Sequence, residues 1–352
     1  MNPHPEAGRI RIPMLCGVVV CIMAACGSDS MTQGPVSDPT SPQNLEGLWT
    51  VSGSRSAFLR LSPDQLSDTG QLAPITEITT PSAPLHTLAG VAFDARGDLW
   101  IASSDDSLLL AFEPQDLDGS GSKQAATVIE SNHGSLGGPT GLAFDRAGRL
   151  WVANHENGTL VRFDAGQLAA GGTPVPAAVI AGAGNPAALA FDADGSLWVS
   201  DNMANRITKY GASQLAGSGS PAPAVVLTAN AGSLVNPAGL AFDASGNLWV
   251  ANISGRTLVA FTPAQLAVTG APSPQIRLVS SAGHSLALPV GLAFDDQGSL
   301  WVIGATGMLS KFVRGSLAVS GSPVPSTVIR IVDHSLFWSV AFWPKPEGLP
   351  LN

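Results

Sequence analysis

The stretch Gly239–Asn252, GLAFDASGNLWVAN, decides the fold because the chain repeats it. Its last eleven residues return in similar form from Phe93, Phe144, Phe191 and Phe294. The tryptophan of this phrase stands at Trp49, Trp100, Trp151, Trp198, Trp249 and Trp301, so neighbouring copies lie 47 to 52 residues apart. Self-similarity at such a period is typical of propellers and solenoids.

Each repeat predicts four short strands. In one copy these are residues 239–242 (GLAF), 248–252 (LWVAN), 257–261 (TLVAF) and 272–278 (PSPQIRL). The glycine suits an inner strand crowded near an axis, and the prolines suit an outer edge, where a missing N–H costs little and discourages edge pairing. Short strands of even spacing, separated by Gly and Pro, favour an all-β fold.

The two ends of the repeat region complement each other. The unit around Trp49 has no inner strand before it, whereas Ser339–Phe342 (SVAF) is an inner strand with no second strand after it. We therefore predict an all-β, six-bladed β-propeller of four-stranded blades, with 3+1 closure between the N- and C-terminal segments. A linear β-solenoid is the alternative, but it would not need complementary half-units at its ends.

Two repeated features are expected to be scaffold. An Asp-x-x-Gly sequence joins the first two strands in five copies, where Asp can bond its own turn and Gly supplies a positive φ. The repeated Trp is expected to wedge between neighbouring blades. The aspartates and glycines are Asp94/Gly97, Asp145/Gly148, Asp192/Gly195, Asp243/Gly246 and Asp295/Gly298.

Charge and cysteine usage exclude several classes of protein. The chain has 17 basic and 26 acidic residues and a formal net charge of −9, with no basic run. This argues against nucleic-acid binding and against electrostatic docking on anionic lipid. The three cysteines, Cys16, Cys21 and Cys26, all lie in the first 26 residues, so the body of the chain cannot form an internal disulfide.

The N-terminus resembles a bacterial lipoprotein signal. Arg9 and Arg11 precede an apolar run that ends in MAAC, and Cys26 stands where the lipidated cysteine of a lipobox would stand. We expect a signal peptide over residues 1–25, the lipidated Cys26 and a flexible tether over 26–44, and the propeller over 45–350. The expected location is the bacterial cell envelope, lipid-anchored on the periplasmic side or on the outer-membrane surface. A plain signal peptide cut near Ala25 is the alternative.

The phrase GLAFDASGNLWVAN resembles the NHL-like and streptogramin-lyase-like propellers over about residues 45–350. Related gluconolactonase-like propellers carry metal-binding Asn and Asp directly before the Gly-apolar start of inner strands. The corresponding residues here are Ala89, Thr140, Ala187, Ala238, Val290 and Trp338, which include no carboxylate or amide. The Glu and His that the resemblance to streptogramin lyases implies are also unmatched, so we assign no catalytic residue, metal or cofactor.

The residues that differ between repeats are the candidate site. Three residues after each Trp stand Ser52, Ser103, Asn154, Asp201, Asn252 and Gly304. These polar groups either cap or end their strands in solvent, or form a ring of ligands on one face. The possible ring-face binding residues are Asn154, His155, Glu156, Asp201, Asn202, Asn252, His284 and His334.

The sequence favours an exported, lipid-anchored, monomeric propeller that binds a small molecule or a protein without its own catalysis. A divergent metal-dependent propeller enzyme, lactonase-like hydrolase or lyase, is the alternative, and a purely structural envelope protein also stays open.

Overall fold

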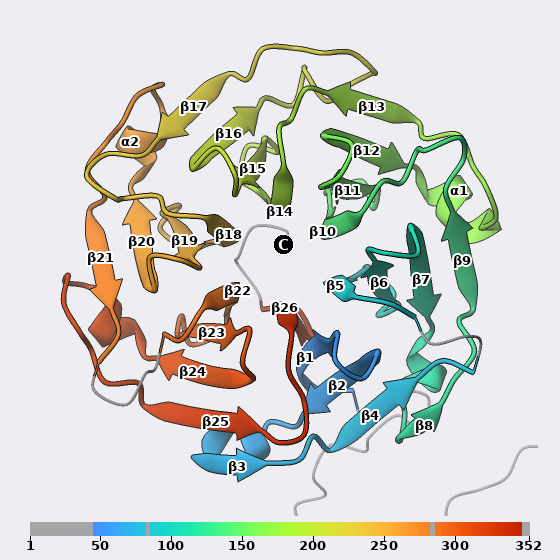
Figure 1. Cartoon of the computed structure of the whole chain (residues 1–352), viewed down its shortest axis with the longest axis horizontal. Helices are drawn as coiled ribbons and strands as arrows, with labels where there is room; N and C mark the ends of the chain where they lie inside the picture. Colours follow the sequence, from blue (N-terminus) through green and yellow to red (C-terminus); the bar gives the residue numbers. More distant parts are fainter. Residues whose placement is uncertain (1–44, 82–84, 282–285, 347–352) are drawn as a thin grey trace, which may run out of the picture. The chain divides into compact units, whose positions relative to one another are not determined.

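The computed structural model describes residues 45–81, 85–281 and 286–346. Within these residues, six β-sheets stand in a ring around a central axis (Figure 1). This confirms the predicted six-bladed β-propeller. Residues 1–44, which include the expected leader, Cys26 and the tether, lie outside the described residues.

Each blade has four antiparallel strands, from an inner strand beside the axis to an outer strand at the rim. Blade 1 contains β26 (Phe337–Trp343), β1 (Gly47–Ser52), β2 (Ala57–Leu61) and β4 (Thr76–Thr79). Blade 2 contains β5 (Leu88–Phe93), β6 (Leu99–Ser103), β7 (Leu108–Phe112) and β9 (Thr127–Glu130). Blade 3 contains β10 (Pro139–Phe144), β11 (Leu150–Asn154), β12 (Thr159–Phe163) and β13 (Ala178–Ala181).

The other three blades repeat this order. Blade 4 contains β14 (Pro186–Phe191), β15 (Leu197–Asp201), β16 (Arg206–Tyr210) and β17 (Val225–Thr228). Blade 5 contains β18 (Pro237–Phe242), β19 (Leu248–Asn252), β20 (Thr257–Phe261) and β21 (Ile276–Val279). Blade 6 contains β22 (Pro289–Phe294), β23 (Leu300–Gly304), β24 (Met308–Phe312) and β25 (Thr327–Ile331).

The loops between the third and fourth strands hold the remaining short elements. They are β3 (Gly70–Leu72), β8 (Gly121–Ser122), α1 (Ala165–Ala170), α2 (Pro263–Leu266) and the 3-10 turns Gln65–Ser67, Pro114–Asp116 and Arg314–Leu317. No helix among the described residues has the length and apolar character needed to cross a membrane.

The ring closes as predicted, with three strands from the N-terminal part and one from the C-terminal part. Strand β26 pairs antiparallel with β1, and Thr50 lies opposite Val340. The hydroxyl of Thr50 also donates to the carbonyl of Ser339 over 2.7 Å. The first and last strands of the propeller therefore belong to one sheet.

Glycine lets the inner strands of neighbouring blades approach closely. A Cβ at Gly90 would lie 2.1 Å from the carbonyl oxygen of Thr140 in the next blade, and one at Gly239 would lie 2.4 Å from that of Val290. Both distances are shorter than van der Waals contact, so no other residue fits without moving the strands apart.

The tryptophans wedge between blades, as expected. In five blades the indole ring meets the phenylalanine of the next inner strand, with ring centroids 6.0 to 6.4 Å apart and mainly edge-to-face. Trp198 and Phe242 are one such pair, and both side chains are buried. Each blade interface therefore contains a large apolar contact of favourable geometry.

Parallel bridges seal the rim of the ring. Each outer strand pairs with the loop between the third and fourth strands of the next blade, as Ile180 does with Gly219. The other five bridges are Ile78–Gly121, Ile129–Gly172, Leu227–Gly270, Leu278–Gly321 and Ile329–Gly70. The outer edges are thus paired. The expectation that prolines lie within the outer strand is wrong, since Pro272 and Pro274, for example, precede β21.

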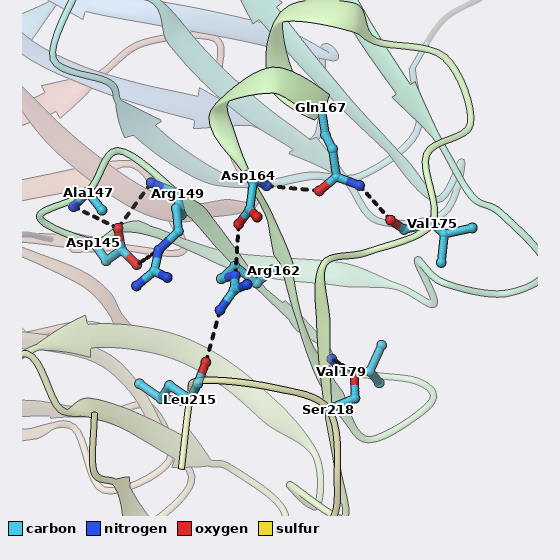
Figure 2. Close-up of polar contacts among 10 residues, drawn as sticks. All are labelled: Asp145, Ala147, Arg149, Arg162, Asp164, Gln167, Val175, Val179, Leu215 and Ser218. Carbon is cyan, nitrogen blue, oxygen red and sulfur yellow. Dashed lines mark hydrogen bonds and ion pairs between the residues drawn. The ribbon is translucent and has the colours of Figure 1, made fainter. Parts of the chain in front are cut away.

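Side chains reinforce this rim. In blade 3 the side chain of Gln167 accepts from the backbone N–H of Asp164 and donates to the carbonyl of Val175 (Figure 2). The hydroxyl of Ser218, from blade 4, accepts from the N–H of Val179 over 3.0 Å. The rim loops are therefore held both within and between blades.

Candidate functional site

The polar residue at the end of the second strand fastens the loop that precedes its blade. The side-chain amide of Asn252 donates to the carbonyl of Ser233 and to the hydroxyl of Thr257, and its oxygen accepts from the N–H of Val235. Asn154 makes the same three kinds of bond in blade 3. Both asparagines are fully buried, and these bonds use their polar atoms within the scaffold.

Asp201, Ser52 and Ser103, at the same position, are also bound within the scaffold, Asp201 to the turn that follows it and the two serines to the preceding loops. The carboxylate of Asp201 is 1% exposed and binds the Arg206 guanidinium over 2.9 Å. The hydroxyls of Ser52 and Ser103, also fully buried, donate to carbonyls of Ser335 and His86 in the preceding loops. Of the two interpretations of this position, the structure shows the local cap, and the strand end is buried rather than solvated.

Two of the predicted residues meet at the axis. His155 follows β11, Asn202 follows β15, and Nε2 of His155 lies 3.3 Å from Oδ1 of Asn202. Both side chains are half-buried and line the opening of a central cavity. This contact joins the loops of blades 3 and 4 on the face formed by the loops between the second and third strands.

The remaining predicted residues do not join this pair. Glu156 is exposed and does not line the cavity. His334 lies at the junction of blades 6 and 1, where its Nε2 is 3.6 Å from a carboxylate oxygen of Glu77. Burial lowers the pKa of His334, although the Glu77 carboxylate opposes this. His284 lies outside the described residues.

A second contact that involves a histidine, between His86 and Asp106, lies on the same face in blade 2. Nδ1 of His86 lies 3.0 Å from a carboxylate oxygen of Asp106, and this hydrogen bond raises the pKa of the His86 imidazole. Burial alone would raise the pKa of Asp106, but hydrogen bonds from His86 and Ser103 outweigh it and hold that pKa below its usual value. Neither His86 nor Asp106 could be picked out from the sequence, because no repeated position marks them.

The central cavity has a volume of about 370 Å³ and an apolar wall. Six of its lining residues are those at which related propellers would place metal ligands: Ala89, Thr140, Ala187, Ala238, Val290 and Trp338. The indole of Trp338 is 41% exposed at the opening, and Met203 beside Asn202 is 69% exposed. The sequence analysis had identified the six positions without seeing that together they enclose a chamber.

No three His, Cys, Asp or Glu side chains are grouped closely enough to hold a metal ion among residues 45–81, 85–281 and 286–346. The donors that could serve, such as His155 and Asp201, are held in separate contacts with Asn202 and Arg206.

The comparison with protein families locates one part of the ring. Residues 177–282 match the SMP-30/Gluconolactonase/LRE-like region. The match runs from the outer strand of blade 3 to the region after β21 and covers less than a third of the chain. No curated protein sequence matches this chain.

Solved structures show the same fold. A streptogramin B lyase has a TM-score of 0.55 and 13% identity, over 80% of this chain and 83% of that one. Virginiamycin B lyase from Staphylococcus aureus, solved with quinupristin, has a TM-score of 0.53 and 13% identity, over 77% and 81%. A chain of the nidogen/laminin complex has a TM-score of 0.56 and 15% identity, over 83% and 96%. At these identities the likeness concerns the propeller alone.

Proposed function

We propose that this propeller is a binding module whose ring face takes up a ligand through the mouth of the central cavity, without chemistry of its own. The observation that carries the proposal is the apolar chamber of about 370 Å³ behind Trp338 and Met203. Concave, mainly apolar sites of roughly 300–1,000 Å³ with a few polar groups at the opening are typical of small-molecule binding.

The chemistry of the wall supports binding over catalysis. At the upper end of the inner strands, the side chains that line the cavity are alanine, valine, threonine and tryptophan. A metal-dependent reaction would need several oxygen or nitrogen ligands there. Two of the polar side chains that line the chamber, His155 and Asn202, are bonded to each other.

The proposal includes attachment to a bacterial envelope membrane through a lipid on Cys26. The support is the MAAC sequence after an apolar run, together with the Ser/Pro/Gly-rich segment that follows. Mass spectrometry of the membrane-fraction protein tests it. A diacylated N-terminal peptide beginning at Cys26 is expected, and an unmodified Cys26 would overturn this part.

Ring-face binding is tested by thermal unfolding of the purified full-length protein with a panel of neutral, acidic and basic small molecules. We expect at least one neutral compound to raise the Tm, and Trp338→Ala to abolish that rise. Val324→Ala is the matched control, because Val324 is 78% exposed and does not line the cavity. Tm shifts that survive in Trp338→Ala would contradict binding at the ring face.

A metal-dependent hydrolase or lyase is the second candidate, and the family match over residues 177–282 favours it. Elemental mass spectrometry of the purified protein and incubation with gluconolactone and with quinupristin test it. About one divalent ion per chain, a Tm lowered by chelator and turnover of either compound would support an enzyme. A metal-free protein that leaves both compounds intact would favour the binding module.

A further inference from the structure

The wall of the central cavity consists of two stacked rings of side chains. The upper ring holds the second residue of each inner strand. The lower ring holds the fourth residue of the same strand. The upper ring is Ala89, Thr140, Ala187, Ala238, Val290 and Trp338; the lower ring is Val91, Leu142, Leu189, Leu240, Leu292 and Val340.

The two rings differ in the size of their side chains. All six lower side chains are branched and apolar, and each is only 4 to 7% exposed, so each shows the cavity a thin strip of surface. In the upper ring, blades 2, 4 and 5 carry alanine, which leaves space that larger side chains would fill. A larger side chain at one of these alanines would therefore reduce the free volume.

Among the described residues, the lining of the cavity contains no Asp, Glu, Lys or Arg. Its hydroxyl groups stand near the mouth, and that of Thr140 lies within hydrogen-bond distance of the carbonyls of Ala153 and Pro186. A charged ligand group placed among the alanines would lose its hydration without gaining a partner, which is strongly unfavourable. An apolar group would instead replace poorly held water or empty space.

We propose that the chamber holds the aromatic or branched-alkyl end of an uncharged small molecule, with a neutral polar end left at the mouth beside His155 and Asn202. This inference rests on the proposed ring-face binding and names its ligand class. Trp338 and Met203 would cover the apolar end, since both present exposed apolar surface at the opening.

Two fluorescent probes that differ by one charged group test the inference. N-phenyl-1-naphthylamine is neutral, and 1-anilinonaphthalene-8-sulfonate is the same ring system with a sulfonate. In titrations of the full-length protein we expect saturable 1:1 binding of the neutral probe and at least about tenfold weaker binding of the sulfonate.

A substitution that fills the chamber locates the probe. Ala238→Leu is expected to weaken binding of the neutral probe by about tenfold or more, since it adds three carbon atoms and a single extra methylene in an apolar pocket already has an effect of about this size. Val290 and Trp338 occupy the same position in other blades, so the strand accepts a larger side chain there. Ala187→Val is a milder second variant. Ala169→Leu, at an exposed position of α1, is the matched control and should bind like the wild type.

The outcomes separate the two proposals. Binding that is lost in Trp338→Ala but unchanged in Ala238→Leu and Ala187→Val would overturn the chamber and leave ring-face binding standing. Equal binding in all variants would place the probe elsewhere and overturn both. A sulfonate probe that binds as tightly as the neutral one would overturn the ligand class.

Discussion

Nε2 of His155 and Oδ1 of Asn202 are 3.3 Å apart and join the loops of blades 3 and 4 at the mouth of the cavity. Each loop is also tied to the loop that follows it. The side-chain amide of Asn185 donates to the carbonyl of His155 over 3.3 Å, and that of Asn236 donates to the carbonyl of Asn202 over 3.2 Å. This side of the mouth is therefore organised before any ligand arrives.

Removing the contact should loosen the mouth while leaving the fold intact. Asn202→Ala is expected to change the free energy of unfolding by only about 0.5–1.5 kcal/mol, the usual size of one hydrogen bond. Dissociation of N-phenyl-1-naphthylamine should become several-fold faster, as measured by stopped-flow fluorescence. Asn132→Ala, a half-buried rim position bonded to the carbonyl of Thr173, serves as control. Unchanged dissociation in Asn202→Ala would show that this contact does not guard the chamber.

The indole N–H groups of the wedged tryptophans should differ in their contribution to stability. Asp192 accepts from Trp198 over 2.9 Å, whereas Nε1 of Trp100 is buried with no partner among the described residues. In blade 2, Arg96 binds the carboxylate of Asp94, the residue equivalent to Asp192.

Trp198→Phe should therefore cost about 0.5–1.5 kcal/mol more than Trp100→Phe, because only the former removes a hydrogen bond, while Lys209 still binds the Asp192 carboxylate. Urea unfolding of the two variants measures the difference. Since both substitutions remove a similar volume, an equal cost would mean that the Trp198 hydrogen bond adds nothing.

Asp98 should make stability depend on pH. Burial, followed by the nearby Asp94 carboxylate, raises the pKa of Asp98 to about 6, although Arg96 opposes the shift. Because the folded pKa is above the unfolded value of about 3.9, the charged form is disfavoured in the folded state. The resulting loss of stability is absent below about pH 4 and develops as the pH rises through about 6.

Asp98→Asn should remove this penalty. Asn247 stands at the equivalent position in blade 5 and donates to Asp243 over 2.8 Å. We expect a gain of about 1 kcal/mol at pH 8 and no gain at pH 4, measured by urea unfolding at both values. A gain of the same size at both pH values would rule out the ionisation of Asp98 as the cause.

The rim bridges should contribute measurably to the stability of the ring. Ser218→Ala deprives the N–H of Val179 of its side-chain acceptor, and we expect a loss of about 0.5–1.5 kcal/mol. Ser213→Ala, at an exposed position of the same loop, is the control. If the two variants unfolded at the same urea concentration, the bridge hydroxyl would not be a stabilising contact.

The repeat made most of the fold predictable. The regular spacing of Trp and Phe indicates the blades. The incomplete repeats at the two ends predict that the last strand pairs with the first, as β26 does with β1. The rim bridges could not be predicted, because they join residues of different blades, about 40 or more positions apart, through backbone atoms of small loop residues such as Gly219. The prolines were placed in the outer strand because edge strands tolerate them, but they mark the turn that leads into it.

The candidate site was less predictable for a physical reason. The identity of Asn154 or Asn252 as asparagine does not reveal whether its amide faces solvent, a ligand or a backbone loop. In the structure both amides are buried and donate to carbonyls of the preceding loops. The chamber depends on which side chains six separate inner strands turn toward one axis. Alanine at positions 89, 187 and 238 carries no chemical signal until the ring brings these residues together.

The most direct test of the account is the heat-capacity change of neutral-probe binding, measured by isothermal titration calorimetry of N-phenyl-1-naphthylamine at several temperatures. Burial of apolar surface in the chamber predicts one site with a clearly negative heat-capacity change in the wild type, and loss of that signal in Ala238→Leu. A heat-capacity change near zero, or an unchanged signal in Ala238→Leu, would contradict a ligand-binding chamber at the centre of the ring.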